Sequence, residues 1–430
     1  MSTFTTPKGT RDFYPEAMVF RDFIFDMWTQ TCRRYCFEHI DAPLFEHFEL
    51  YTQKSGEEIE RQLYTFVDKG GRKLALRPEL TPSVARMVAA KGTSLKRPIR
   101  WYSIPRLFRY ERMQKGRLRE FFQLNMDILG IAEVSADAEL IAAVIAMMTD
   151  LGLDKDDFSV LISSRTLLEE LFVASGFAQA ELPALYALLD KKPKMSAEEF
   201  ERKLNEQLHD PARAATIQKV FSYETLDDIE KDFAGIQPLA DLMQLFSYLT
   251  ALGLAEYVRF DIGIVRGLAY YTGIVFEVFD KHKSMRAVAG GGRYDNLVSL
   301  YGGQSTPAVG FAAGDVVLGD LLMSRGIAPP VQARADVYLA EFAETHPRYS
   351  LELASLLRSH RISVEYSLKS TGFGKQMKQI NALGIPLVVI AGSQEAERNT
   401  VKVKDMRSGE EEIVDKSRLI AKLSDLLSHR

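Results

Sequence analysis

The chain has 430 residues, of which 46% are hydrophobic and 26% are charged, and its formal net charge is −4. This length supports two or three domains rather than one. A slightly acidic chain has no global basic field, so any nucleic-acid contact is expected to come from local basic patches. The sequence has no run of about 18 apolar residues and no signal-peptide pattern, which predicts a protein without a membrane segment.

The two cysteines of the chain, Cys32 and Cys36, lie four positions apart. Such a pair cannot form a disulfide framework, and a reducing cytoplasm is the expected compartment. With His39 they would share one helical face, which raises the alternative of a metal site. A structural zinc site needs a fourth ligand and usually a loop spacing. Small core residues are therefore the favoured interpretation, and no metal site is predicted.

The N-terminal region predicts one long helix followed by strands. Apolar residues recur at helical spacing over residues 15–36. Residues 41–51 favour a strand that contains Pro43, and a proline there suggests an edge or an interface position. Residues 62–81 predict two strands joined by the turn Asp68-Lys69-Gly70-Gly71.

The second of these strands ends in the loop Arg77-Pro78-Glu79-Leu80-Thr81. A loop that offers a carboxylate and a hydroxyl just past a strand end suits a ligand amine. Thr81 could equally cap the next helix, with Pro82 at its first position. Both interpretations can hold together, because the cap and the ligand contact would use different atoms of the loop.

A basic stretch follows, and it holds seven Lys and Arg side chains: Arg100, Arg106, Arg109, Arg112, Lys115, Arg117 and Arg119. The turn Gln114-Lys115-Gly116 separates two flanks that favour strands, the second over residues 120–128. Strand residues at i and i+4 face the same way, so Gln123 and Asp127 are expected on one face beside Phe121. Arginines near an aromatic ring and a carboxylate suit a ligand that combines phosphates, a flat ring and a hydrogen-bonding group.

The rest of the first 330 residues predicts a mixture of helices and strands. The expected elements are a helix over 136–151, a strand over 158–162, a charged helical insertion over 165–235, a helix over 238–253, two strands within 257–279 around Arg266-Gly267, and a strand entering a helix over 307–323. Gly290, Gly291 and Gly292 indicate either a hairpin corner or a place where the backbone approaches a ligand. Their spacing matches neither a dinucleotide fingerprint nor a Walker loop.

The segment Ala328-Pro329-Pro330 predicts a linker. Beyond it, residues 335–430 alternate between strand and helix patterns and end in a hairpin and a terminal helix. This order predicts a small α/β domain with a mostly parallel sheet.

Several separate motifs then carry a resemblance to one family. They are PKGTRDF at 7–13, LRPELTPS at 76–83, FRYERMQKGRLREFFQLNMDILG at 108–130, RGLAYYTGIVFEVF at 266–279, AGGGRYDNL at 289–297 and PAVGFAAGD at 307–315. Together they resemble those of the histidyl-tRNA synthetases, which are class II aminoacyl-tRNA synthetases. The resemblance covers essentially the full length, and its specificity comes from the combination of motifs rather than from any one of them.

The resemblance implies an α+β catalytic domain over residues 1–330, built on an antiparallel sheet flanked by helices and carrying the helical insertion. Residues 331–430 would form an α/β anticodon-binding domain. The implied reaction joins histidine and ATP, with Mg²⁺, into histidyl-adenylate and pyrophosphate, and then transfers histidine to the 3′ end of tRNA(His). A homodimer that uses about Phe20 to Leu50 is also implied.

The resemblance also assigns roles residue by residue. Arg109, Arg266 and Gln123 would be catalytic. Histidine would contact Glu79, Leu80, Thr81, Gln123, Asp127, Arg266, Tyr270 and Tyr271. ATP would contact Arg109, Glu111, Arg117, Phe121 and Arg293. The acceptor end of tRNA would contact Arg112, Gln114 and Lys115.

Two positions depart from the family pattern. Val317 stands where many class II enzymes carry an arginine that packs on adenine, and Arg293 is the candidate to compensate. Asp127 stands where some members have the longer glutamate. Two other functions compete with the enzyme: a regulatory paralogue that activates ATP phosphoribosyltransferase, and a synthetase-like RNA sensor. The first usually lacks the C-terminal domain, and the second usually carries an additional signalling domain, so the enzyme is favoured.

Overall fold

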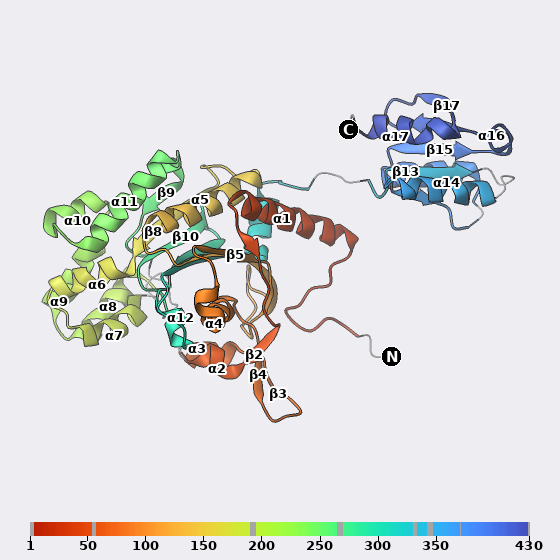
Figure 1. Cartoon of the computed structure of the whole chain (residues 1–430). Helices are drawn as coiled ribbons and strands as arrows, with labels where there is room; N and C mark the ends of the chain where they lie inside the picture. Colours follow the sequence, from red (N-terminus) through yellow and green to blue (C-terminus); the bar gives the residue numbers. More distant parts are fainter. Residues whose placement is uncertain are drawn as a thin grey trace. The chain divides into compact units, whose positions relative to one another are not determined.

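The computed structural model describes residues 4–53, 57–189, 195–264, 270–329, 333–341, 347–369 and 371–428. Contacts along the chain divide it into two compact units, Met1–Pro329 and Pro330–Arg430 (Figure 1). Each unit has its own buried core.

A large sheet organises the first unit. Its strands are β1 (Glu38–His39), β5 (Ile99–Ser103), β6 (Arg106–Phe108), β7 (Glu120–Leu129), β8 (Phe158–Ser164), β9 (Val258–Phe260), β10 (Ile274–Asp280), β11 (Ala289–Arg293) and β12 (Ala308–Gly314). Eight of these described strands follow the order β1-β5-β7-β12-β11-β10-β8-β9, and β6 pairs with β7 beside that path. Every pairing from β5 to β8 is antiparallel, whereas the outer pairs β1–β5 and β8–β9 are parallel. The predicted antiparallel fold class is confirmed.

Helices cover both faces of this sheet. The main core lies beneath α1 (Pro15–Arg34), α5 (Ser135–Asp150), α11 (Gln237–Ala251) and α13 (Asp315–Ser324), whereas α4 (Thr81–Lys91) and α12 (Leu297–Leu300) pack on the other face. Within the described ranges, no helix combines the length and apolar character needed to cross a membrane.

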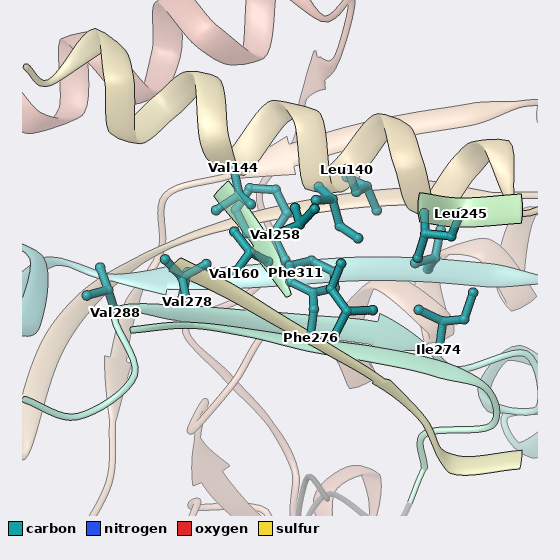
Figure 2. Packing of buried hydrophobic residues seen from close by; sticks show 14 of the residues in the cluster. Leu140, Val144, Val160, Leu245, Val258, Ile274, Phe276, Val278, Val288 and Phe311 are labelled. Atoms are coloured by element: carbon teal, nitrogen blue, oxygen red, sulfur yellow. The ribbon is translucent and has the colours of Figure 1, made fainter. Parts of the chain in front are cut away.

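The sequence of the strands separates the two faces. Leu124, Met126 and Ile128 alternate along β7 and all enter the main core, because successive strand side chains point to opposite faces. Figure 2 shows the same arrangement farther along the sheet, where Phe276 and Phe311 pack beneath the α5 helix. Burial of each such side chain stabilises the fold by roughly 1.5–3 kcal/mol, which anchors β7 in its register.

A smaller antiparallel sheet projects from the unit, in the order β2-β4-β3. It contains β2 (Phe45–His47), β3 (Thr65–Val67) and β4 (Lys73–Leu76), and α2 (Phe48–Thr52) and α3 (Glu57–Gln62) lie between β2 and β3 in the chain. The predicted turn after β3 is confirmed, since the Asp68 carboxylate accepts the backbone N–H groups of Gly70 and Arg72, both at 2.9 Å. The strand predicted for 41–51 is confirmed only over Phe45–His47, because residues 41–44 are not in a strand and helix α2 begins at Phe48.

The helical pattern predicted for residues 165–235 is present. Its helices are α6 (Arg165–Ala174), α7 (Leu182–Leu189), α8 (Ala197–Leu208), α9 (Pro211–Val220) and α10 (Leu226–Asp232). Ser196 caps α8 by accepting the Glu199 backbone N–H at 3.1 Å. In the chain the segment lies between β8 and α11, and its described residues add no strand to the sheet.

The second unit is a mixed sheet with helices. Its elements are β13 (Val337–Glu341), α14 (Pro347–Ser359), β14 (Val364–Tyr366), α15 (Phe373–Leu383), β15 (Leu387–Ala391), α16 (Ser393–Arg398), β16 (Thr400–Asp405), β17 (Glu411–Asp415) and α17 (Leu419–Ser428). The strand order is β14-β13-β15-β16-β17. The pairs of β13 are parallel, but β16 is antiparallel to both of its neighbours. The prediction of a mostly parallel sheet is therefore wrong, because the final hairpin adds two antiparallel pairings.

The helical face proposed for the two cysteines is not formed. Helix α1 ends at Arg34, and Cys36 lies beyond it with a φ of 60°. Cys32 is buried in the main core, whereas Cys36 is exposed. The two thiols therefore occupy different environments.

Candidate active site

The face of β7 opposite the main core carries Phe121, Gln123, Asn125 and Asp127, as the two-residue strand period predicts. Their direct partners on β12 are small, because Gln123 pairs with Gly314, Asn125 with Ala312 and Asp127 with Gly310. The next strand continues this row, with Gly290 and Gly292 on β11. This side of β11 and β12 therefore has no bulky side chains. We call the surface formed by Gly290, Gly292, Gly310, Ala312 and Gly314 the floor, and the side chains of β7 border it.

Two glycines of this floor make room for functional side chains. A Cβ atom on Gly310 would lie 2.1 Å from Oδ1 of Asp127, and one on Gly292 would lie 3.0 Å from the Tyr271 ring. The glycine run predicted at 290–292 is thus a central strand where groups approach closely, and the alternative of a hairpin corner is wrong.

Asp127 is a buried carboxylate on this side of the sheet. The residue is only 4% exposed, and its Oδ1 accepts a hydrogen bond from the Tyr294 hydroxyl at 2.5 Å. Burial raises the pKa of Asp127 to about 7, and the Tyr294 hydrogen bond opposes that rise. The same burial and the nearby Asp127 charge raise the pKa of Tyr294 well above its usual value. Tyr294 therefore stays protonated and available as a donor.

A second carboxylate, Glu79, enters the pocket from the loop before α4. Its Oε2 accepts a hydrogen bond from the Tyr270 hydroxyl at 2.9 Å. Burial raises the pKa of Glu79, while the Arg109 charge and the Tyr270 hydrogen bond lower it. Arg109 also holds this loop directly, because its Nε donates to the Pro78 carbonyl at 2.8 Å.

Three tyrosine rings connect the two carboxylates. The centroid of the Tyr270 ring lies 5.1 Å from that of Tyr271 and 6.2 Å from that of Tyr294. Contacts therefore run continuously from Glu79 through Tyr270 and Tyr294 to Asp127. The structure thus brings the predicted residues Glu79, Asp127 and Tyr270 together, although they come from three distant parts of the sequence.

Leu80 and Thr81 sit where the loop becomes helix. Leu80 occupies the N-cap position of α4 and its side chain is buried in the core on this face. Thr81 is already the first helical residue, so the cap predicted for its side chain is wrong. Thr81 is half-buried and lies two positions after Glu79 in the chain.

The residues predicted for ATP gather near the start of β7. The guanidinium carbon of Arg109 lies 5.3 Å from the Phe121 ring centroid. Glu111 and Arg117 form a close ion pair across the turn that precedes β7. This end of the floor thus combines an aromatic face with fixed positive charge, which suits a nucleotide.

The turn between these residues is solvent-facing. Arg112, Gln114 and Lys115 are all exposed. Gly116 has a φ of +75°, a conformation that favours glycine. An isolated bridge joins Gln114 to Arg117 and closes the turn. The three exposed side chains are therefore available to a partner.

Arg293 does not face the nucleotide end of the floor. Its guanidinium binds Oδ2 of Asp137 at 2.5 and 2.9 Å, and also the carbonyls of Ile131 and Glu133 at 3.1 and 2.6 Å. The residue is 7% exposed. The ATP contact predicted for Arg293 is therefore wrong, because its donors fix the start of α5 to β11.

One predicted residue lies outside the described residues, and one residue of the site was not predicted. Arg266 lies outside the described residues, as does the rest of 265–269. Tyr294 was missed as a pocket residue, although it lies in the motif AGGGRYDNL. Its side chain could have been placed only by knowing that Gly310 pairs with Asp127, which is a tertiary feature.

Comparison with known proteins shows the family of the chain. A family model described as histidyl-tRNA synthetase matches residues 9–315, and one described as an anticodon-binding domain matches residues 330–426. The chain is 41% identical to a histidine–tRNA ligase of Opitutus terrae, over all of both chains. It is 39% identical to the chloroplastic/mitochondrial histidine–tRNA ligase of Arabidopsis thaliana, over 98% of this chain and 85% of that one.

Solved structures give the same fold. A histidyl-tRNA synthetase from Nostoc sp. PCC 7120 superposes with a TM-score of 0.82 at 23% identity, covering 99% of this chain and 100% of that one. The apo histidyl-tRNA synthetase of S. aureus gives 0.71 at 25% identity, covering 98% and 100%. The chain therefore belongs to the histidyl-tRNA synthetase family, whose reaction is the ATP-dependent joining of histidine to tRNA.

Proposed function

We propose that the floor of the sheet divides the histidine–tRNA ligase reaction between its two ends. Histidine occupies the end at Asp127, and ATP occupies the end at Phe121. The observation that carries this division is the buried Asp127–Tyr294 hydrogen bond of 2.5 Å, set beside a glycine that no larger residue could replace. An ionisable carboxylate held in such a place needs a specific partner.

The imidazole ring of histidine supplies that partner. Asp127 accepts one ring N–H, and the Tyr271 hydroxyl meets the other nitrogen. Glu79, Thr81 and Gln123 take the α-amino group, with the Leu80 backbone and Tyr270 lining the pocket. A site whose buried polar groups are left unpaired by an analogue rejects that analogue strongly.

At the other end, Phe121 stacks on adenine while Glu111 and Arg117 hold adenine or the outer phosphates. Arg109 and Arg266 approach the α-phosphate, where negative charge develops. A histidine carboxylate oxygen attacks the α-phosphorus in line, the bond to the β-phosphate breaks, and pyrophosphate leaves. A ribose hydroxyl of tRNA then attacks the histidyl carbonyl carbon, and AMP leaves.

Mg²⁺ accompanies ATP in this proposal and neutralises its phosphates. Glu277 pairs with Gly290 on the sheet, so it shares the floor side with Asn125 and Ala312. Carboxylate oxygens are ligands that Mg²⁺ prefers. Glu277 is therefore the carboxylate of this floor that would hold the ion.

The tRNA meets both units. The exposed turn of Arg112, Gln114 and Lys115 contacts the acceptor end through its backbone phosphates. Residues 331–430 bind the anticodon, a role supported by the family model that matches 330–426. The unpaired thiols of Cys32 and Cys36 support a reducing, cytoplasmic location.

A homodimer through the region of Phe20 to Leu50 is also proposed. Leu44 and Phe45 are exposed there, and the Phe45 ring packs edge-to-face on the exposed Phe66 ring at 5.7 Å. Exposed apolar side chains grouped in this way favour a protein interface.

Replacement of Arg109 by Ala tests the division of the floor. Single-turnover formation of histidyl-adenylate should fall by about 100-fold or more, because the arginine acts on charge that develops in the transition state. The dissociation constant of histidine, measured by calorimetry, should change much less. An equal loss in both quantities would remove Arg109 from the catalytic role.

A further inference from the structure

The position that carries an arginine in many class II enzymes is apolar here. Val317 lies in the first part of α13, is 8% exposed and belongs to the main core. Its Cγ2 lies 3.1 Å from where a Cβ of Gly116 would be, so the Val317 side chain packs against the turn before β7. A valine has no charge to offer, and Arg293 is committed to Asp137. The nucleotide end therefore lacks one cation from its expected source.

Arg286 reaches the same place from another element. It lies in the connection between β10 and β11, and its side chain is exposed. Its Cδ and Cγ lie 3.7 and 4.0 Å from the same Cβ position on Gly116. The stem of Arg286 thus packs beside Val317 against the turn that carries Arg117.

A second arginine and two carboxylates influence the Arg286 guanidinium. Among the described residues, no hydrogen bond or ion pair of the Arg286 guanidinium is found. Partial desolvation lowers the pKa of Arg286, and the neighbouring Arg117 charge lowers it further, while Glu111 and Glu277 oppose both effects. Because Glu111 is already paired with Arg117, two guanidinium groups repel each other at the edge of the floor. An anion placed between them would turn that repulsion into attraction.

We propose that Arg286 binds the β- and γ-phosphates of ATP together with Arg117, and so adds a cation to a nucleotide end that has a valine at position 317. This assignment rests on the proposed ATP site at the Phe121 end of the floor. It makes the β10–β11 connection part of that site. Guanidinium groups bind phosphate oxygens in a bidentate manner, which is why two of them at one polyphosphate are effective.

The variant Arg286→Gln tests this inference in the full-length enzyme by histidine-dependent exchange of pyrophosphate into ATP. The KM for ATP should rise by about 10-fold or more, since a hydrogen bond to a charged group is lost. The KM for histidine should stay within about two-fold. Binding of ATP and of pyrophosphate should weaken, whereas binding of adenosine should not.

Lys283→Gln is the matched control, because it removes one positive charge from the same connection. Lys283 pairs with Asp261 at 3.1 Å, so the KM for ATP of Lys283→Gln should equal that of the wild type. A wild-type KM for ATP in Arg286→Gln would overturn the inference, and an equal loss of adenosine binding would overturn its phosphate assignment. Absence of exchange in the wild-type enzyme would instead refute the proposed function itself.

Discussion

At the scale of single residues, burial decides what each charged group can do. Asp127 and Asp137 are both carboxyl groups nearly removed from water, and burial raises the pKa of each, to about 7 and about 6. Asp137 has a permanent partner in the Arg293 guanidinium, whereas Asp127 has a tyrosine hydroxyl. Asp137 is therefore structural, whereas Asp127 keeps a lone pair for a ligand.

Tyr294→Phe should shift the pH dependence of histidine use. The carboxylate of Asp127 is the form that accepts the imidazole N–H, and it predominates above a pKa of about 7. Therefore kcat/KM for histidine should fall as pH drops through that value. Loss of the Tyr294 donor removes stabilisation of the charged form, so the midpoint should move upward by about one to two pH units. Exchange assays from pH 6 to 9.5 measure it.

The substrate imidazole titrates in the same range, but it does so equally in both enzymes. The difference between the two profiles therefore isolates the protein group. Asp127→Asn should lack this titration altogether. Superimposable profiles of Tyr294→Phe and wild type would show that the hydroxyl does not control Asp127.

Arg293→Met should weaken the fold without touching ATP use. It leaves the buried Asp137 without its cation, a change that costs about 3–5 kcal/mol in free energy of unfolding. Urea unfolding of the full-length protein measures that loss. The KM for ATP should remain at the wild-type value at temperatures where the variant is folded. A raised KM with unchanged stability would restore the nucleotide role first expected of Arg293.

At the scale of elements, β7 with its neighbours is what the sequence could predict best. The strand, its two faces and the helix of α5 follow from local alternation and spacing, which need no knowledge of distant residues. The positions of Tyr294 and Arg293 depend on how β11 pairs with β12 and packs under α5. Such pairing is tertiary, so the motif showed that these residues belong together but not which way each one faces.

The same distinction explains the errors elsewhere. The segment from Phe48 carries residues that favour a strand, but it forms α2 beside the small sheet, because packing overrides weak propensity. The alternation of strand and helix patterns over residues 335–430 predicts a mostly parallel sheet. Only the final pairings of β16 and β17 revealed the mixed sheet.

Gly310→Ala tests the floor formed by β12 and β11. The added Cβ would lie 2.1 Å from Oδ1 of Asp127, so the carboxylate must move. A displacement of about 1 Å in a positioned group can cost about 100-fold in kcat/KM, and the loss here should appear chiefly in the KM for histidine. The KM for ATP should change much less.

Gly319→Ala on the adjoining helix is the control, since its Cβ would make an ordinary contact of 3.4 Å with the Phe20 ring. Both variants add one methyl group to buried backbone. If Gly310→Ala used histidine as well as Gly319→Ala did, the proposed position of the pocket would be wrong.

At the scale of the whole molecule, the chain forms two units with separate cores. The first unit carries every residue assigned to histidine and ATP. Its exposed apolar residues at the small sheet are what a second copy of the chain would cover.

Phe45→Asp tests that interface. Phe45 is 47% exposed beside Phe66, so a charge there should disrupt a dimer by placing an unpaired carboxylate in an apolar contact. Sedimentation should show twice the chain mass for the wild type and a monomer for the variant. Ile413→Asp, at an exposed position of the second unit, should remain dimeric. A monomeric wild type would contradict the interface.

The proposed activity of the sheet floor is the activation of histidine with ATP. Exchange of labelled pyrophosphate into ATP by the purified full-length protein measures this activity. We expect exchange that requires histidine and is not supported by the other standard amino acids, because the pocket has partners for both imidazole nitrogens. A folded protein that gave no histidine-dependent exchange with ATP and Mg²⁺ would contradict the claim and favour a regulatory role.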